Sequence, residues 1–121
     1  MIYADTDFLL AMIKKEDWLK SSANKVYEKN KGKIETSMAA IIEIILVSNR
    51  LGLDVENVTG SIFKLVGVEG ITLEEAMEAA HLVKDEHVGV FDAFHAVLSR
   101  NRPIASSEHI YDKIGKQRIK L

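Results

Sequence analysis

The sequence predicts an α/β fold, a three-layer sandwich with a central, mostly parallel sheet of four to five strands flanked by helices. Short apolar runs typical of buried strands alternate with longer segments of helical periodicity, a pattern that favours a parallel sheet. No repeat, linker or low-complexity segment interrupts this alternation. We therefore expect residues 1–121 to form a single domain with its own core.

Each expected element has a local signal. The expected strands are 2–4, 34–36, 66–71 and 103–106, with a possible edge strand at 118–121. The expected helices are 8–13, 21–29 (begun near Asp17), 38–50, a helix opened by Asp54 or Asn57 and ending near 65, 72–84 and 91–100.

Cap residues support these boundaries. Thr6 or Asp7 is placed to cap the first helix, and Ser37 the helix that ends at Gly52. Thr72 and Glu75 form the S/T-x-x-E pattern of a capping box, in which two backbone amides are satisfied reciprocally.

The composition is that of a globular protein, with 47% hydrophobic and 28% charged residues. The absence of cysteine excludes disulfides, thiolate zinc sites and cysteine nucleophiles, and fits an intracellular, cytoplasmic protein. No apolar run approaches the roughly 18 residues of a membrane span, and the first residues lack the basic region of a signal peptide. We expect no membrane association.

A net charge of −2 would ordinarily argue against nucleic acid as a partner. That inference weakens if several carboxylates sit together and bind cations, because the remaining surface would then be mildly basic. Net charge alone does not decide the partner.

Four acids occur beside core-forming sequence in four separate elements. They are Asp5, Glu43, Asp92 and Glu108. Each alone could be a helix cap, a first-turn acid or a solvated side chain. Together they predict a shared negative pocket, because Asp5 and Glu108 follow strands whose carboxyl ends lie at one edge of a parallel sheet.

Such a pocket destabilises a fold unless cations neutralise it. Carboxylate oxygens are the ligands of hard divalent ions such as Mg²⁺, and a hydrated Mg²⁺ or Mn²⁺ suits phosphodiester hydrolysis. We interpret Asp5 as a metal ligand supported by Thr6 or Asp7, although Asp7 is also placed to cap a helix.

Four segments, in their order and spacing, resemble the PIN-domain family, and especially the VapC-like ribonucleases of prokaryotic toxin–antitoxin pairs. The segments are A-D-T-D-F-L-L, the apolar helix around Glu43, F-D-A-F-H-A, and I-A-S-S-E-H-I-Y-D with its aromatic Tyr111. The resemblance covers nearly the whole chain. It places the family's acids on Asp5, Glu43, Asp92 and Glu108.

The resemblance implies a Mg²⁺- or Mn²⁺-dependent endoribonuclease that hydrolyses single-stranded or structured RNA and leaves 5′-phosphate and 3′-hydroxyl ends. Asp5 and Asp92 would be the principal metal ligands, and Glu43 would bind metal or orient water. Glu108, where Asp is usual, would hold a second or outer position. It also implies a homodimer and a small antitoxin partner.

Thr6 and Ser106 would orient the metal ligands by hydrogen bonds. His95 could order a water or contact phosphate, but a half-buried structural histidine fits the sequence better. We expect Trp18 and Tyr27 to pack in the core, although an exposed Trp18 could stack a base. The early lysines form either a solvated face or a track for the RNA backbone.

Three other functions remain open. A catalytically silent PIN-like module could bind RNA or a partner, and a nuclease without an antitoxin could process RNA. The Asp5-x-Asp7 pattern also occurs in phosphatases of the haloacid-dehalogenase type, but Leu9 replaces their Thr or Val, and that function leaves Glu43 and Asp92 unexplained.

Overall fold

The computed structural model describes residues 1–121, and its centre is a five-stranded sheet in which every paired strand is parallel. The strand order is β3-β2-β1-β4-β5. The strands are β1 Ile2–Ala4, β2 Ile34–Ser37, β3 Gly67–Glu69, β4 Ile104–Ser106 and β5 Arg118–Lys120. All five expected strands are thus present, the possible edge strand included.

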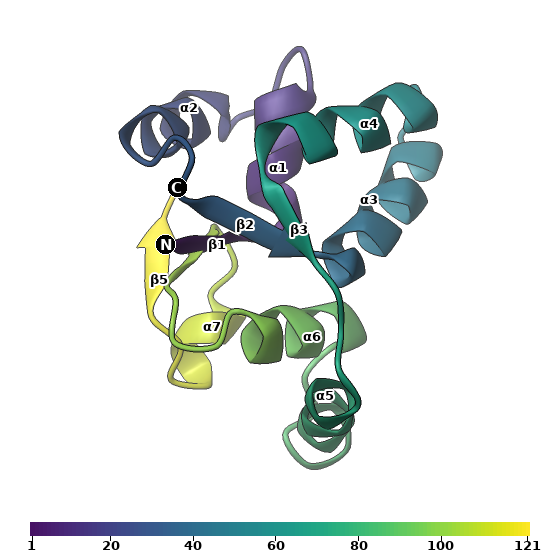
Figure 1. Ribbon diagram of the computed structural model, residues 1–121, viewed down its shortest axis with the longest axis vertical. Helices are drawn as coiled ribbons and strands as arrows, with labels where there is room; N and C mark the ends of the chain where they lie inside the picture. Colours follow the sequence, from purple (N-terminus) through teal and green to yellow (C-terminus); the bar gives the residue numbers. More distant parts are fainter.

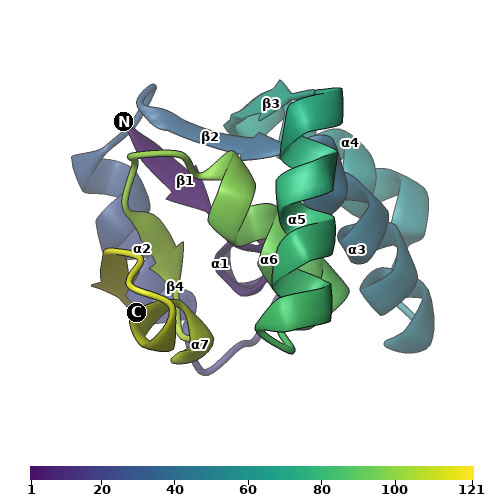
Figure 2. The same cartoon turned by 90° about the horizontal axis from the view of Figure 1, so that it is seen from below.

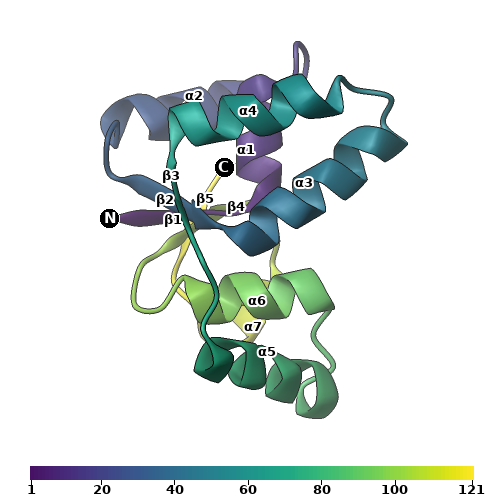
Figure 3. The same cartoon turned by 45° about the vertical axis from the view of Figure 1, so that its right-hand side comes forward.

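Seven helices surround the sheet. They are α1 Thr6–Ile13, α2 Lys20–Lys29, α3 Met38–Arg50, α4 Val55–Leu65, α5 Leu73–Asp85, α6 Val90–Leu98 and α7 Ile110–Lys113. Helices α1, α2 and α4 cover one face of the sheet, and α5, α6 and α7 lie on the other (Figure 1). Figure 3 shows the three layers edge-on, with α3 rising from the end of β2. The predicted α/β sandwich is confirmed.

The strands carry apolar side chains on both faces because helices cover both faces. On β1, Ile2 and Ala4 belong to the larger core cluster, while Tyr3 points to the opposite face and joins a second cluster with Leu98 and Ile104. Burying each large apolar side chain is worth about 1.5–3 kcal/mol, so this alternation fixes the register of the central strand.

The connections place a switch point beside the central strand. From β1 the chain adds β2 and β3 on one side, and then returns to add β4 and β5 on the other side. The loops that follow the carboxyl ends of β1 and β4 therefore run in opposite directions. Open parallel sheets bind ligands in the crevice between two such loops. Figure 2 shows β1 running toward the space between α1 and α6.

Two predicted caps differ from the structure. Asp5, rather than Thr6 or Asp7, is the N-cap of α1, and its side chain accepts a hydrogen bond from the Thr6 amide. Ser37 stands at the N-cap of α3 but makes no capping bond, because its hydroxyl lies 2.7 Å from the Tyr3 hydroxyl. The Thr72–Glu75 capping box of α5 is confirmed.

The connection between α1 and α2 also corrects an expectation. Trp18 is 83% exposed, so the prediction that it packs in the core is wrong, whereas Tyr27 packs against the larger cluster. Two of the early lysines have structural partners: Lys14 pairs with Asp17, and Lys20 donates to the carbonyls that end α1. The short helix α7 was not predicted from the sequence. None of the helices combines the length and the apolar character needed to span a bilayer.

Candidate active site

An acidic pocket of about 210 Å³ opens where the carboxyl ends of β1 and β4 meet α3 and α6. All four acids predicted from the sequence line it. The lining consists of Asp5, Thr6, Asp7 and Leu10 from β1–α1, Glu43 and Val47 from α3, Asp92 from α6 and Glu108 after β4. Acids separated by up to 103 residues along the chain are thus neighbours in space.

Asp5 is the deepest of these acids, with 4% of its surface exposed. Its Oδ1 accepts a hydrogen bond of 2.7 Å from the Thr6 amide, and its Oδ2 accepts one of 2.6 Å from the Ser106 hydroxyl. The same Ser106 oxygen accepts the Glu108 amide at 2.9 Å. Ser106 thereby ties the loop after β4 to the carboxylate that follows β1.

Glu43 reaches the pocket from α3 and is held through one oxygen. Its Oε1 accepts hydrogen bonds from the Thr6 hydroxyl and from His95 Nε2, the latter at 2.8 Å. His95 Nε2 also lies 3.5 Å from Asp5 Oδ1. Asp5, Glu43 and His95 each place one possible ligand atom within 4.8 Å of the others.

Asp7 is a site acid as well as a first-turn residue of α1. Its Oδ2 accepts hydrogen bonds from the amide and the hydroxyl of Ser107, so it helps to fix the loop after β4. Its Oδ1 is buried without any hydrogen-bond partner. An orphaned buried carboxylate oxygen is costly and indicates a place for a cation or water.

Asp92 and Glu108 form the outer part of the pocket. Asp92 is half-buried, and the Tyr111 hydroxyl lies 3.5 Å from its Oδ1. Glu108 is exposed at the rim, and Asp5 is the only one of the four predicted acids that is buried. Neither Asp92 nor Glu108 belongs to the tight group that joins Asp5, Glu43 and His95.

The electrostatics reflect this crowding. Burial raises the pKa of Asp5 to about 6, a rise that the charge of His95 limits. Burial also raises the pKa of Asp92, with the Glu43 charge adding to it. Burial and the neighbouring Asp92 charge raise the pKa of Glu108.

The pKa values of Glu43 and His95 shift in opposite directions. Burial raises the pKa of Glu43, but the hydrogen bonds from His95 and Thr6 outweigh it and lower the pKa overall. Burial lowers the pKa of His95, but the Glu43 hydrogen bond and the Asp5 charge outweigh that effect and raise it. No Lys or Arg side chain forms an ion pair with Asp5, Asp7, Glu43, Asp92 or Glu108.

His95 lies at the site although the sequence favoured a structural role for it. The predicted half burial is wrong, because the ring is fully buried, and the ring contacts two of the pocket acids. The available signal was its position three residues after Asp92 on one helix face. That spacing alone does not distinguish a core histidine from one at a site.

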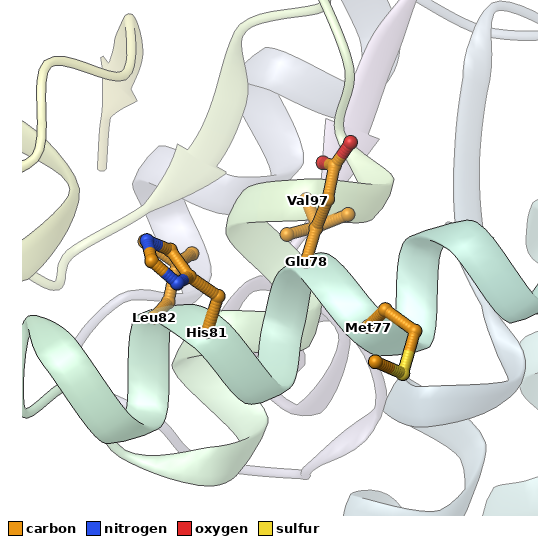
Figure 4. A pocket seen from close by; sticks show the side chains of 5 residues that line it. All are labelled: Met77, Glu78, His81, Leu82 and Val97. Atoms are coloured by element: carbon orange, nitrogen blue, oxygen red, sulfur yellow. The ribbon is translucent and has the colours of Figure 1, made fainter.

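A second hollow, of about 400 Å³, lies on α5 and α6 (Figure 4). Its lining is largely apolar and comprises Met77, Glu78, His81, Leu82 and Val97. Glu78 is the single acid of the lining. His81 is paired with Asp85, one turn further along α5. This hollow is larger than the acidic pocket but lacks converging polar groups, so we assign the candidate site by chemistry rather than by size.

Comparison with known proteins identifies the fold. No family sequence model matches the chain, and no curated protein matches it by sequence. Solved structures do match it, and the fold is that of the PIN-like VapC toxins.

The chain is similar to the sarcin-ricin loop cleaving toxin VapC20 of Mycobacterium tuberculosis, with a TM-score of 0.82 and 17% identity over 100% of both chains. It is also similar to a chain of the DNA-bound VapBC of Salmonella typhimurium, with a TM-score of 0.72 and 17% identity over 98% of this chain and 96% of the other. It is similar, too, to a chain of a toxin–antitoxin complex from Klebsiella pneumoniae, with a TM-score of 0.70 and 13% identity over 90% of this chain and 88% of the other. At these identities the likeness shows the fold.

Proposed function

We propose that this protein is a Mg²⁺- or Mn²⁺-dependent endoribonuclease and acts as the toxin of a toxin–antitoxin pair. One observation carries the proposal: five carboxylates line one pocket at the switch point of a parallel sheet, and no Lys or Arg forms an ion pair with any of them. The VapC toxins that share the fold support it, since one of them is described as cleaving the sarcin-ricin loop.

The donor set fits a hard divalent cation. The pocket offers carboxylate oxygens from separate elements, among them the orphaned Asp7 Oδ1. The pKa values of Asp5, Asp92 and Glu108 are raised, which means that the pocket disfavours its own negative charge. A bound cation would remove that penalty.

We assign roles by position. Asp5 and Asp92 would be the principal ligands, and Glu43 would bind metal or orient water. Glu108 would contribute from the rim, where its exposure suits a weaker or outer position. Thr6 orients Glu43 and Ser106 orients Asp5 through their hydroxyls.

A divalent cation in this pocket would activate water and stabilise the negative charge that develops on phosphorus. The protein's carboxylates orient the attacking water in line with the scissile bond and accept the proton that the water loses. Water oxygen adds to phosphorus, the bond from phosphorus to the 3′ oxygen breaks, and that oxygen takes up a proton. The products are a 5′-phosphate and a 3′-hydroxyl.

The test is an assay of labelled single-stranded and hairpin RNA with Mg²⁺, Mn²⁺ or EDTA. We expect metal-dependent cleavage by the wild type, losses of at least about 100-fold in Asp5→Asn and Asp92→Asn, and 5′-phosphate ends. Asp54→Asn, an exposed cap on α4, serves as the matched control. Equal activity in all variants would indicate a contaminating nuclease and refute the proposal. RNA binding without cleavage would favour a silent PIN-like module.

We further propose an antitoxin partner, a homodimer and a cytoplasmic location. Three of the similar structures are toxin–antitoxin complexes, which supports a partner of that kind. Apolar side chains on the outer face of α3 support a protein contact there, since Ile42, Ile45 and Leu46 are 43–55% exposed. Light scattering of the pure protein tests the dimer.

Toxicity can be tested separately from cleavage. Induced expression should arrest growth, Asp92→Asn should abolish the arrest, and the product of the neighbouring reading frame should restore growth and co-purify. A catalytically active protein that neither arrests growth nor binds that product would favour a nuclease that processes RNA without an antitoxin.

A further inference from the structure

A chain of buried polar groups runs behind the acidic pocket. The Tyr3 hydroxyl lies 2.7 Å from Ser37 Oγ and 2.8 Å from His95 Nδ1, and His95 Nε2 lies 2.8 Å from Glu43 Oε1. Tyr3, Ser37 and His95 are fully buried, and none of them lines the pocket. The chain thus connects β1, the end of β2, α6 and α3, and its closest contact with the pocket lining is the one from His95 to Glu43, at 2.8 Å against 3.5 Å to Asp5.

The direction of the last hydrogen bond follows from the donors available. An ionised Glu43 carboxylate only accepts, so His95 Nε2 must carry the proton that lies between them. At Nδ1 the ring either accepts from the Tyr3 hydroxyl or donates to it, and Ser37 Oγ can serve as donor or acceptor in turn. In both arrangements the Nε2–H group points at Glu43.

The two donors to Glu43 share one oxygen. Thr6 and His95 both donate to Oε1, whereas Oε2 makes no hydrogen bond within the protein. A glutamate has three side-chain torsions, and fixing such a side chain costs about 1–2 kcal/mol of conformational entropy. Two donors on a rigid background can offset that cost before any ligand arrives.

We propose that His95 and Tyr3 are positioning residues that hold the Glu43 carboxylate with Oε2 free for the pocket, and that they thereby set its affinity for a divalent cation. The inference rests on the proposed function in taking the pocket as a cation site. His95 acts as a donor to a ligand, because its Nε2 is directed at Glu43. Tyr3 acts one step further away, by fixing the ring of His95.

The geometry favours a rigid support over a loose contact. The Tyr3 and His95 rings lie with centroids 5.7 Å apart, inclined at 52°. Arg102 also packs on Tyr3, with its guanidinium carbon 5.6 Å from the centroid of the Tyr3 ring. Tyr3 is therefore fixed by strand pairing and by its neighbours, so its hydroxyl is a stable reference point for His95.

The experiment measures Mn²⁺ binding to the purified protein by the electron paramagnetic resonance signal of the free ion, so it needs no RNA. His95→Leu removes the donor, and His95→Gln restores an N–H near the position of Nε2. Tyr3→Phe removes only the hydroxyl, and Tyr27→Phe is its matched control outside the site. Ile62→Ala, in the core of α4, reports the effect of lost stability alone.

We expect His95→Leu to weaken Mn²⁺ binding by about 10-fold or more, as for other groups that orient metal ligands. His95→Gln should stay within about 3-fold of wild type, and Tyr3→Phe should fall between the two. Tyr27→Phe and Ile62→Ala should bind as wild type does. Wild-type affinity in His95→Leu, or an equal loss in His95→Gln and His95→Leu, would overturn the inference. So would a matching loss in Ile62→Ala.

The outcome is separable from that of the proposed function. If the wild type binds Mn²⁺ but cleaves no RNA, the nuclease proposal fails, while the series of affinities still decides the roles of His95 and Tyr3. If the wild type binds no Mn²⁺, both are overturned.

Discussion

Asp5→Asn should stabilise the metal-free protein at neutral pH, although it removes a buried group with two good hydrogen bonds. The reason is the pKa of Asp5, which burial raises from 3.8 to about 6. A shift of this size means that ionised Asp5 costs the folded state on the order of 3 kcal/mol above pH 6. A neutral amide removes that penalty.

The gain is partly offset. In the wild type, the Ser106 hydroxyl donates a hydrogen bond of 2.6 Å to Asp5 Oδ2. In the Asp5→Asn variant the side-chain oxygen can still accept from the Thr6 amide, but the side-chain nitrogen cannot accept from Ser106. Losing a hydrogen bond to a charged group costs about 1.5–3 kcal/mol, and partial relaxation recovers some of it. We expect a net gain of about 1 kcal/mol, or roughly 4 °C in Tm.

The dependence on pH identifies the cause. Because the folded-state pKa of Asp5 lies above its unfolded value, the folded state binds the proton more readily, and stability falls as pH rises from about 4 to 6. The advantage of Asp5→Asn at pH 7.5 should therefore vanish near pH 5, and near pH 4, where the penalty on ionised Asp5 is gone, the variant should be less stable than wild type because the lost hydrogen bond remains. Urea unfolding followed by circular dichroism at these pH values measures it.

Asp54→Asn is the matched control, since Asp54 caps α4 in the same way but is exposed. It should change stability by less than about 0.5 kcal/mol, because asparagine also caps helices and the position is at the surface. If Asp5→Asn were less stable than wild type by a constant amount at pH 5 and pH 7.5, the charge of Asp5 would not be penalised, and the case for a strained acidic pocket would fail.

The remaining predictions concern the pocket and its supports. Mg²⁺ at 100 times its Kd should stabilise the wild type by about 2.7 kcal/mol, measured as a rise in Tm. Asp92→Asn should reduce this rise, and identical rises in both proteins would contradict a cation site at Asp92. Arg102→Ala should lower the free energy of unfolding in urea by about 3 kcal/mol, because the Arg102 side chain is only 11% exposed and its guanidinium lies 2.8 Å from the Glu69 carboxylate. Arg50 is exposed, so Arg50→Ala should change this free energy little. Gly52→Ala should cost about 1 kcal/mol, because Gly52 has φ of +69° after α3; an unchanged urea midpoint would refute this.

The order of strands and helices could be predicted because it depends on local patterns. The apolar run at 2–4, the capping box at Thr72 and the glycine after α3 each act within a few residues, and the structure contains each of them. The caps of α1 and α3 were misjudged for a tertiary reason. Asp5 and Ser37 are in contact with side chains from distant strands and helices, which decide where their oxygens point.

The candidate site divides in the same way. Its acids could be found because carboxylates in apolar sequence are anomalous wherever they occur. The role of His95 could not be decided, because an apolar helix face explains a histidine without any partner. Its place between Tyr3 and Glu43 depends on β1, α3 and α6 meeting, which no local pattern encodes. The exposure of Trp18 likewise depends on how the α1–α2 connection lies over the sheet.

The sequence by itself determined the succession of elements, the acidic character of the loops after β1 and β4, and the absence of cysteine chemistry. Only the tertiary structure decided which oxygens of those acids are bound and which are free, and that a buried histidine stands behind them. The physical reason is range. Helix caps and strand periodicity act within a few residues, whereas desolvation, charge repulsion and hydrogen bonding in the pocket depend on groups up to about 100 residues apart that meet only in the folded chain.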